Sequence, residues 1–164
     1  MEKNLGIYIH VPFCRSKCEY CDFYSLSGGR TKELMDKYLH AVTEHIREAA
    51  ALAPEYVADS VYFGGGTPTF FGAENLKRIF AEINRRFQLS RDCEITFEAN
   101  PDSATPQTLR RLRRAGFNRM SLGVQSDANE VLKALGRPHS YEQAVQAIRS
   151  AREAGFDNIS VDLM

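Results

Sequence analysis

The segment Arg113-Arg-Ala-Gly-Phe-Asn-Arg-Met-Ser121 recurs later in the chain as Arg152-Glu-Ala-Gly-Phe-Asp-Asn-Ile-Ser160. In both copies a charged, helix-forming stretch ends at a glycine, and a strand pattern begins after the phenylalanine. Two copies are too few for a solenoid, but successive units of this kind are typical of an α/β barrel. Right-handed crossovers through the helices make the strands of such a sheet parallel. The repeat therefore predicts an α/β fold.

Strand and helix patterns alternate along the rest of the chain as well. Apolar runs predict strands over 6–11, 60–63, 94–98, 118–124 and 159–163. Helical spacing with capping and stop signals predicts helices over 31–53, 76–87, 105–116, 127–135 and 141–154. Because a closed barrel needs more strands, we expect a partial (β/α) barrel of about five parallel strands with outer helices, truncated at the C-terminus. Residues 1–164 would then be the N-terminal part of a core domain, with the remainder of the barrel and any C-terminal domain absent.

The charge balance excludes several classes of partner. Lys+Arg and Asp+Glu both number 21, so no net charge favours nucleic acid or an anionic membrane. The basic run between Arg110 and Arg114 is expected to be a solvated helix face, with nucleic-acid binding as the weaker alternative. No apolar run approaches the roughly 18 residues of a spanning helix, and no signal-peptide pattern opens the chain. We therefore expect a soluble, cytoplasmic protein without a membrane span.

Three of the four cysteines lie in one short segment, Cys14-Arg-Ser-Lys-Cys18-Glu-Tyr-Cys21, directly after the first predicted strand. Closely spaced thiolates suit an iron–sulfur cube, and three ligands would leave one of its four irons open to a small molecule. The alternative is a structural zinc site with His10 as a fourth ligand, although a hydrogen-bonded core histidine is the favoured interpretation of His10. Cys93 is expected to be a buried small hydrophobe.

Further polar and glycine positions follow the strands. The turn Gly64-Gly-Gly-Thr-Pro68 is expected to bring backbone close to a ligand and to leave its N–H groups free, the alternative being a tight turn into a helix. Polar residues after later strands are expected at the mouth of the barrel, where active sites lie, or else to be ordinary strand-end hydrogen bonders; these residues are Glu98, Gln125, Arg137 and Asp162.

The cysteine segment belongs to a longer series of motifs that covers essentially the whole chain. In order, they are Tyr8-Ile-His-Val-Pro-Phe-Cys14, Cys21-Asp-Phe23, Tyr62-Phe-Gly-Gly-Gly-Thr-Pro-Thr69, Glu98-Ala-Asn-Pro101, Ser121-Leu-Gly-Val-Gln125 and Gly136-Arg137. The CxxxCxxC spacing with Tyr20 between the last two cysteines resembles the radical S-adenosylmethionine (SAM) superfamily. The whole series resembles the HemN-like, coproporphyrinogen III dehydrogenase-like family within it. The resemblance implies a barrel of the radical SAM type.

The resemblance also implies cofactors and the residues that hold them. Cys14, Cys18 and Cys21 would be the metal ligands of a [4Fe–4S] cluster, whose open iron binds SAM. Glu98 would help to hold SAM, and the glycine turn would receive its amino end. Some of these positions match contacts to a second SAM in the dehydrogenase branch. The implied cofactor-binding residues are Tyr8, Tyr20, Gly65, Gly66, Thr67, Glu98, Gln125, Arg137 and Asp162.

Two functions follow from the resemblance. Cys21-Asp22-Phe23 is similar to the heme-chaperone branch, whereas the dehydrogenase pattern carries a further cysteine at the position of Phe23. The favoured hypothesis is a chaperone that binds heme and transfers it to acceptor proteins, with flavodoxin or ferredoxin as electron donor. The alternative is an oxygen-independent coproporphyrinogen III dehydrogenase, which decarboxylates its porphyrinogen oxidatively through a 5′-deoxyadenosyl radical in porphyrin biosynthesis. The third hypothesis, which does not depend on the resemblance, is a zinc-stabilised binding module.

Overall fold

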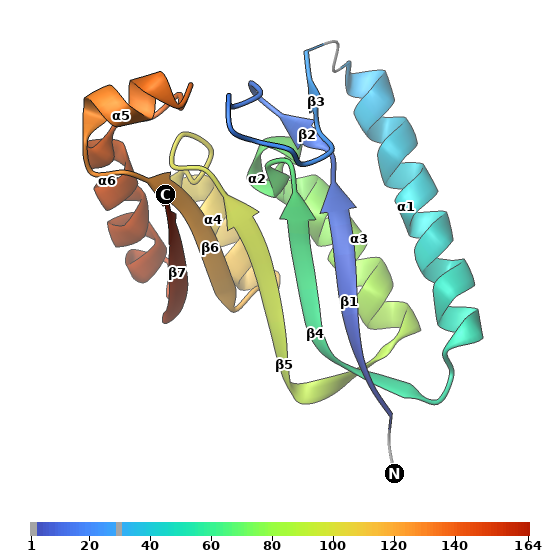
Figure 1. Ribbon diagram of the computed structural model, residues 1–164. Coiled ribbons are helices and arrows are strands. Elements are labelled where there is room, and N and C mark those ends of the chain that lie inside the picture. Colours follow the sequence, from blue (N-terminus) through green and yellow to red (C-terminus); the bar gives the residue numbers. More distant parts are fainter. Residues whose placement is uncertain (1–2, 29–30) are drawn as a thin grey trace.

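The computed structural model describes residues 3–28 and 31–164. Its centre is a five-stranded parallel sheet in the order β1-β4-β5-β6-β7 (Figure 1), as the alternating pattern predicts. The strands begin and end as follows: β1 Lys3–Val11, β4 Tyr56–Gly65, β5 Gln88–Ala99, β6 Arg119–Gln125 and β7 Asn158–Leu163. All five carboxyl ends therefore meet at one edge of the sheet, the upper edge in Figure 1.

Helices connect the strands in sequence. They are α1 Lys32–Leu52, α2 Pro68–Phe71, α3 Ala73–Arg86, α4 Pro106–Arg114, α5 Asn129–Ala134 and α6 Tyr141–Glu153. In Figure 1, α3 and α4 lie behind the sheet, α1 lies beyond the β1 edge, and α5 stands above the carboxyl ends of the strands. Gly72 divides the predicted helix 76–87 from the short α2 that precedes it. No helix in the described ranges is long and apolar enough to cross a membrane.

The repeated segment forms the same local structure twice. Gly116 and Gly155 both have left-handed backbones, with φ of 105° and 93°, directly after α4 and α6. The phenylalanines that follow, Phe117 and Phe156, are fully buried and contact Phe97 with ring centroids 5.6 and 5.5 Å apart. Each glycine therefore turns the chain so that an aromatic ring enters the core before the next strand begins.

The two faces of the sheet differ sharply in polarity. On β5, Ile95 and Phe97 are buried in the core with the helices, whereas Thr96 and Glu98 point to the opposite face. The polar face continues across β6 and β7, where Arg119 donates hydrogen bonds to Thr96 Oγ1 (3.3 Å) and Ser160 Oγ (3.1 Å). Alternation along each strand thus gives one face to the core and leaves the other lined with hydrogen-bonding side chains.

Caps form as the capping signals predict, and one pair of strands was not predicted. Thr105 caps α4, and Ser140 with Gln143 forms a reciprocal capping box on α6. On either side of the cysteine segment, β2 (Phe13–Cys14) pairs in parallel with β3 (Leu26–Ser27), a sheet too short to leave a periodic pattern in the sequence. His139 lies in the loop before α6 and is buried, with Nε2 3.1 Å from the Val124 carbonyl oxygen.

A buried carboxylate joins α1 to α3. The Glu82 side chain is 9% exposed and accepts hydrogen bonds from Arg47 Nε on α1 (2.8 Å) and from Arg86 Nε (3.0 Å), with Arg85 as a third partner. Hydrogen bonding to Arg47 is the main cause that lowers the pKa of Glu82 to about 2. Because the folded state holds this carboxylate ionised, the stabilisation is complete above the unfolded pKa, near 4.5, and is lost as pH falls toward 2.

Replacing this carboxylate should lower stability in a pH-dependent way. We expect Glu82→Gln to reduce the free energy of unfolding by about 1 kcal/mol at pH 7, since its half-exposed arginine partners weaken the pairs. The difference between the two chains should shrink as pH falls through 4 toward 2. Urea unfolding at several pH values measures it. Glu74→Gln, which removes an exposed pair with Lys77 on the same helix, is the control and should change stability by less than about 0.5 kcal/mol. A pH-independent difference would contradict the assignment.

Candidate functional site

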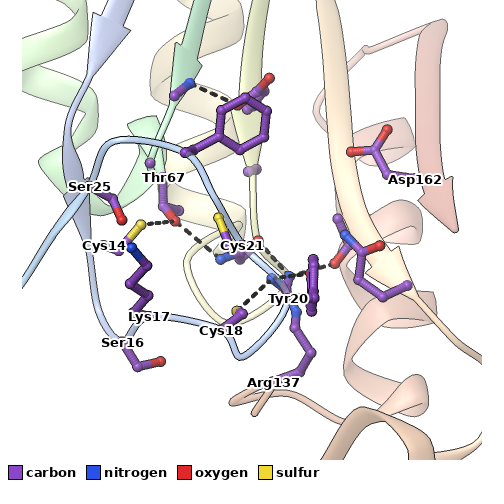
Figure 2. Close-up of a pocket in the computed structure, with 18 residues that line it drawn as sticks. Cys14, Ser16, Lys17, Cys18, Tyr20, Cys21, Ser25, Thr67, Arg137 and Asp162 are labelled. Atoms are coloured by element: carbon purple, nitrogen blue, oxygen red, sulfur yellow. Dashed lines mark hydrogen bonds between the residues drawn. The ribbon is translucent and has the colours of Figure 1, made fainter. Parts of the chain in front are cut away.

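A cavity of about 150 Å³ lies at the carboxyl edge of the sheet, between the cysteine segment and the ends of β4 to β7. Cys14, Cys18 and Cys21 all line it, from one side (Figure 2). Cys14 is buried, and the other two thiols are half-buried. The three cysteines that the sequence brings together in one segment therefore face one space, across which Asp162 of β7 stands on the opposite wall.

The cysteine segment is a loop closed at its base. Pro12 ends β1, and its carbonyl oxygen accepts a hydrogen bond from Leu26 N (2.6 Å), where β2 pairs with β3. Inside the loop, Cys21 N donates to Cys18 O (3.1 Å), which forms a turn. A hydrogen bond thus joins the two ends of the loop, and a turn folds its middle. The three thiols are therefore carried by one compact loop.

The glycine turn packs directly against this loop. A Cβ atom at Gly66 would lie 2.8 Å from the Phe13 carbonyl oxygen and 3.0 Å from Cys14 Sγ, so only glycine fits there. The close approach that the glycines predict is therefore present. The free N–H groups are not: Gly66 N donates to Val11 O and Thr67 N to Phe13 O, both at 2.8 Å. That expectation was wrong because the turn pairs with the loop beside it.

Glu98 stands at the end of β5 and is held by two donors. Its Oε1 accepts from Tyr62 Oη at 2.8 Å and its Oε2 from Gly65 N at 3.1 Å. Burial raises the pKa of Glu98, and the two hydrogen bonds oppose that rise by favouring the charged form. The result is an oriented carboxylate on the wall of the cavity.

Tyr8 is the one implied cofactor residue that does not line this cavity. Its hydroxyl lies 3.1 Å from His10 Nδ1, and its ring stacks against Tyr62 with centroids 6.1 Å apart. A Cβ at Gly64 would touch both Tyr8 and Glu98, so Tyr8 lies next to the cavity, separated from it by the Glu98 wall. It borders a separate apolar groove between β1 and α1.

The remaining implied residues meet on the far side. Gln125, which ends β6, has a left-handed backbone with φ of 72° that glycine alone adopts readily. Asp162 of β7 accepts a hydrogen bond from Ser121 Oγ (3.3 Å). Both line the cavity, together with Tyr20, Gly65, Gly66, Thr67, Glu98 and Arg137. Topology thus gathers residues that are far apart in sequence, and their roles in binding stay predictions.

Arg137 links the cysteine loop to the sheet. Its guanidinium donates to Gly123 O (2.8 Å), to Asn100 Oδ1 (2.6 Å) and to Cys18 Sγ (3.5 Å). It also reaches Tyr20 Oη at 3.4 Å, while the buried Nε has no hydrogen-bond partner among the residues that the structure describes. Figure 2 shows this side chain between Cys18 and Tyr20. Burial raises the pKa of the Tyr20 phenol, and the charge of Arg137 opposes that rise.

Several lining residues were not predicted as site residues, and two of them, Asn100 and Ser25, bear on the hydrogen bonding of the cavity. Asn100, in the loop after β5, donates from Nδ2 to Thr67 Oγ1 (3.2 Å) and accepts from Arg137. Ser25 faces the cavity with a buried hydroxyl that has no hydrogen-bond partner. The rule that selected Glu98, a polar side chain at the carboxyl end of a strand, also applies to Asn100 and could have found it.

The zinc alternative loses its fourth ligand. Both ring nitrogens of His10 face other partners, Nδ1 the Tyr8 hydroxyl and Nε2 the Tyr24 carbonyl oxygen at 2.9 Å. The histidine is therefore hydrogen-bonded as expected, but it is half-buried and lies outside the core. His10 is also absent from the lining of the cysteine cavity. Within 3–28 and 31–164, no three His, Cys, Asp or Glu side chains converge closely enough for a single metal ion.

The donor set fits an iron–sulfur cluster with SAM beside it. Each thiolate of a cube binds a different iron, so three separate thiols on one wall of the cavity suit a cube better than a single ion. The turn that approaches Cys14 without side chains and the buried, unpartnered donors of Ser25 and Arg137 fit a polar group bound in the same space.

Comparison with known proteins shows the family of the chain. The model of the radical SAM superfamily matches residues 8–164. The chain is 39% identical over 160 residues to the heme chaperone HemW of Bacillus subtilis, covering 96% of this chain and 41% of the relative. It is 32% identical over 163 residues to the oxygen-independent coproporphyrinogen III oxidase of Salmonella typhimurium, covering 99% of this chain and 35% of the relative.

A solved structure shows the same fold. The coproporphyrinogen III oxidase HemN from Escherichia coli, described as a radical SAM enzyme, superposes with a TM-score of 0.91 at 33% identity. The match covers 99% of this chain and 37% of that one. The chain thus spans about two-fifths of the length of the relatives it matches.

Proposed function

The chain belongs to the radical SAM superfamily, and from this premise we propose that Cys14, Cys18 and Cys21 hold a [4Fe–4S] cluster next to bound SAM. Membership implies the cluster and SAM; the assignment to residues is the proposal. The observation that carries it is the single cavity lined by the three thiols, the glycine turn and the oriented carboxylate of Glu98. When bound, the cluster supplies the electron that cleaves the sulfonium of SAM.

The residues of the chain bind and orient. Cys14, Cys18 and Cys21 would hold three of the four irons, and the fourth would be open to the amino and carboxylate groups of SAM. The carbonyls of the glycine turn, together with Glu98, suit an ammonium group, because both accept hydrogen bonds. Gln125 and Asp162 on the far wall present acceptors and donors for the remaining polar parts of the nucleotide.

The whole protein is proposed to be a heme chaperone. Phe23 replaces the further cysteine of the dehydrogenase pattern and lines the cavity with a side chain that is 63% exposed. Relatives named heme chaperone HemW match nearly all of this chain. Residues 1–164 would be the N-terminal part of the radical SAM core. The protein would bind heme, pass it to acceptor proteins, and take electrons from a flavodoxin or ferredoxin.

The second candidate is a coproporphyrinogen III dehydrogenase, favoured by the close superposition on HemN. An anaerobic assay of the full-length protein distinguishes the two. Decarboxylation of coproporphyrinogen III at catalytic rate would support the dehydrogenase and defeat the chaperone. Stable heme binding, with transfer to an apo-acceptor and no decarboxylation, would do the opposite.

The cluster and its open iron can be tested directly. We expect anaerobically reconstituted and reduced protein to give the electron paramagnetic resonance (EPR) signal of a [4Fe–4S] cluster, and SAM to change its shape by binding the open iron. Methylthioadenosine, which lacks the amino and carboxylate groups, is the control and should leave the signal unchanged. A preparation with zinc in place of iron and acid-labile sulfide would overturn the proposal, as would a signal that is indifferent to SAM.

A further inference from the structure

Asn100 has both ends of its amide in defined hydrogen bonds. Its Oδ1 accepts from Arg137 Nη2 at 2.6 Å, and its Nδ2 donates to Thr67 Oγ1 at 3.2 Å. A guanidinium can only donate, so the oxygen must face Arg137 and the amide N–H groups must face Thr67. The donors and acceptors around the amide therefore fix which end is the oxygen and which is the nitrogen.

This orientation determines what the Thr67 hydroxyl does. Its oxygen already accepts from Asn100, and Cys14 Sγ lies 3.7 Å away. A metal-bound thiolate can only accept a hydrogen bond, so the Thr67 proton is donated to the Cys14 sulfur. Figure 2 shows this contact between Thr67 and Cys14. Thr67 is 5% exposed, which keeps water from competing for it.

The amide oxygen of Asn100 acts through Arg137 on a second sulfur, that of Cys18. By accepting from Nη2 of Arg137, Asn100 holds the guanidinium so that Nη1 points to Cys18 Sγ at 3.5 Å. Arg137 Nη2 donates to Gly123 O (2.8 Å) as well as to Asn100, and these two hydrogen bonds fix the plane of the guanidinium. Two chains of hydrogen bonds thus run from one amide to two of the three cysteine sulfurs.

We propose that Asn100 is a positioning residue that aims the donors of Thr67 and Arg137 at the sulfurs of Cys14 and Cys18, and thereby raises the reduction potential of the bound cluster. The inference rests on the proposed function. Reduction adds negative charge to the cluster, and donors to the cysteine sulfurs stabilise that charge. A cluster without them is harder to reduce.

Redox titration of the reconstituted chain, followed by EPR, tests the inference. We expect Asn100→Ala and Thr67→Val each to lower the midpoint potential enough to cut the ratio of reduced to oxidised cluster about tenfold at fixed potential, which is about 59 mV for one electron. Thr67→Ser keeps the hydroxyl and should restore the wild-type potential. Ser103→Ala is the matched control, because Ser103 contacts the Asn100 carbonyl (3.0 Å) and Thr69 (2.6 Å) and should leave the potential unchanged.

A double-mutant cycle separates positioning from general disruption. If Asn100 acts partly through Thr67, the effect of Asn100→Ala on potential is smaller in the Thr67→Val background than in wild type. Loaded Asn100→Ala and Thr67→Val clusters with the wild-type potential would overturn the inference while leaving the proposed function intact. A wild-type chain that forms no cluster would overturn both. If Asn100→Ala does not bind the cluster, the midpoint potentials of Thr67→Val and Thr67→Ser decide, because the valine is nearly isosteric with threonine and the serine keeps the hydroxyl.

Discussion

We expect a chain carrying Cys18→Ser to emerge from anaerobic reconstitution nearly colourless, with iron and acid-labile sulfide reduced by at least about tenfold relative to wild type. The reason is that a serine hydroxyl stays protonated near neutral pH, whereas iron is held by thiolates. Two remaining thiols cannot enclose a cube, and the donor of Arg137 that lies 3.5 Å from Cys18 Sγ loses its acceptor. Iron and sulfide analysis with the visible absorption spectrum measures the loss.

Cys93→Ser is the matched control for this experiment. Cys93 is buried on β5 and does not line the cavity. It should load iron as the wild type does; burial, with the charges of Asp59 and Glu94, raises the pKa of its thiol. Equal loss of iron from both variants, or full loading of the Cys18 variant, would contradict the assignment of the three clustered cysteines as the ligands.

Gly66→Ala is expected to damage both the fold and the site. The new Cβ would lie 2.8 Å from the Phe13 carbonyl oxygen, which cannot move freely because it accepts from Thr67 N. It would also lie 3.0 Å from Cys14 Sγ, so the relief of the clash displaces a cluster ligand. We expect a loss of about 2–3 kcal/mol in the free energy of unfolding, together with reduced iron loading. Chemical denaturation and iron analysis of the same preparation measure the two effects.

Gly72→Ala tells crowding apart from backbone strain. Gly72 has φ of 102°, but a Cβ there would meet no atom within 4 Å. Alanine at this position, where ψ is 143°, should therefore cost only backbone strain, about 1–3 kcal/mol, and should load iron normally. If Gly66→Ala loaded iron as well as Gly72→Ala, the turn would not press on the cysteine loop as described.

The sheet and its order were predictable because they depend on local signals. Glycine after a helix, then a phenylalanine and a strand, occurs at Gly116 and Gly155, and both positions have the left-handed backbone that the pattern needs. Parallel strands bring their carboxyl ends together, so strand-end residues such as Glu98 and Asp162 were expected near one another before any coordinates were known.

The hydrogen bonds inside the site were not predictable in the same way. Donors of the glycine turn were expected to be free, but Gly66 and Thr67 pair with the first loop, a contact between segments far apart in sequence. Asn100 is an ordinary polar residue until Arg137 and Thr67 are seen on either side of its amide. The pairing of β2 with β3 involves two residues from each strand, which is too few for any periodicity.

At Gln125 the requirements of stability and of ligand binding differ. Its left-handed backbone, φ 72°, is one that glycine would adopt at lower cost. An engineer who ranked substitutions by tolerance to heat would choose glycine at this position, and would remove an amide from the wall of the cavity in doing so. Selection for stability alone would therefore favour glycine at this residue, whereas the proposed nucleotide pocket requires the glutamine amide.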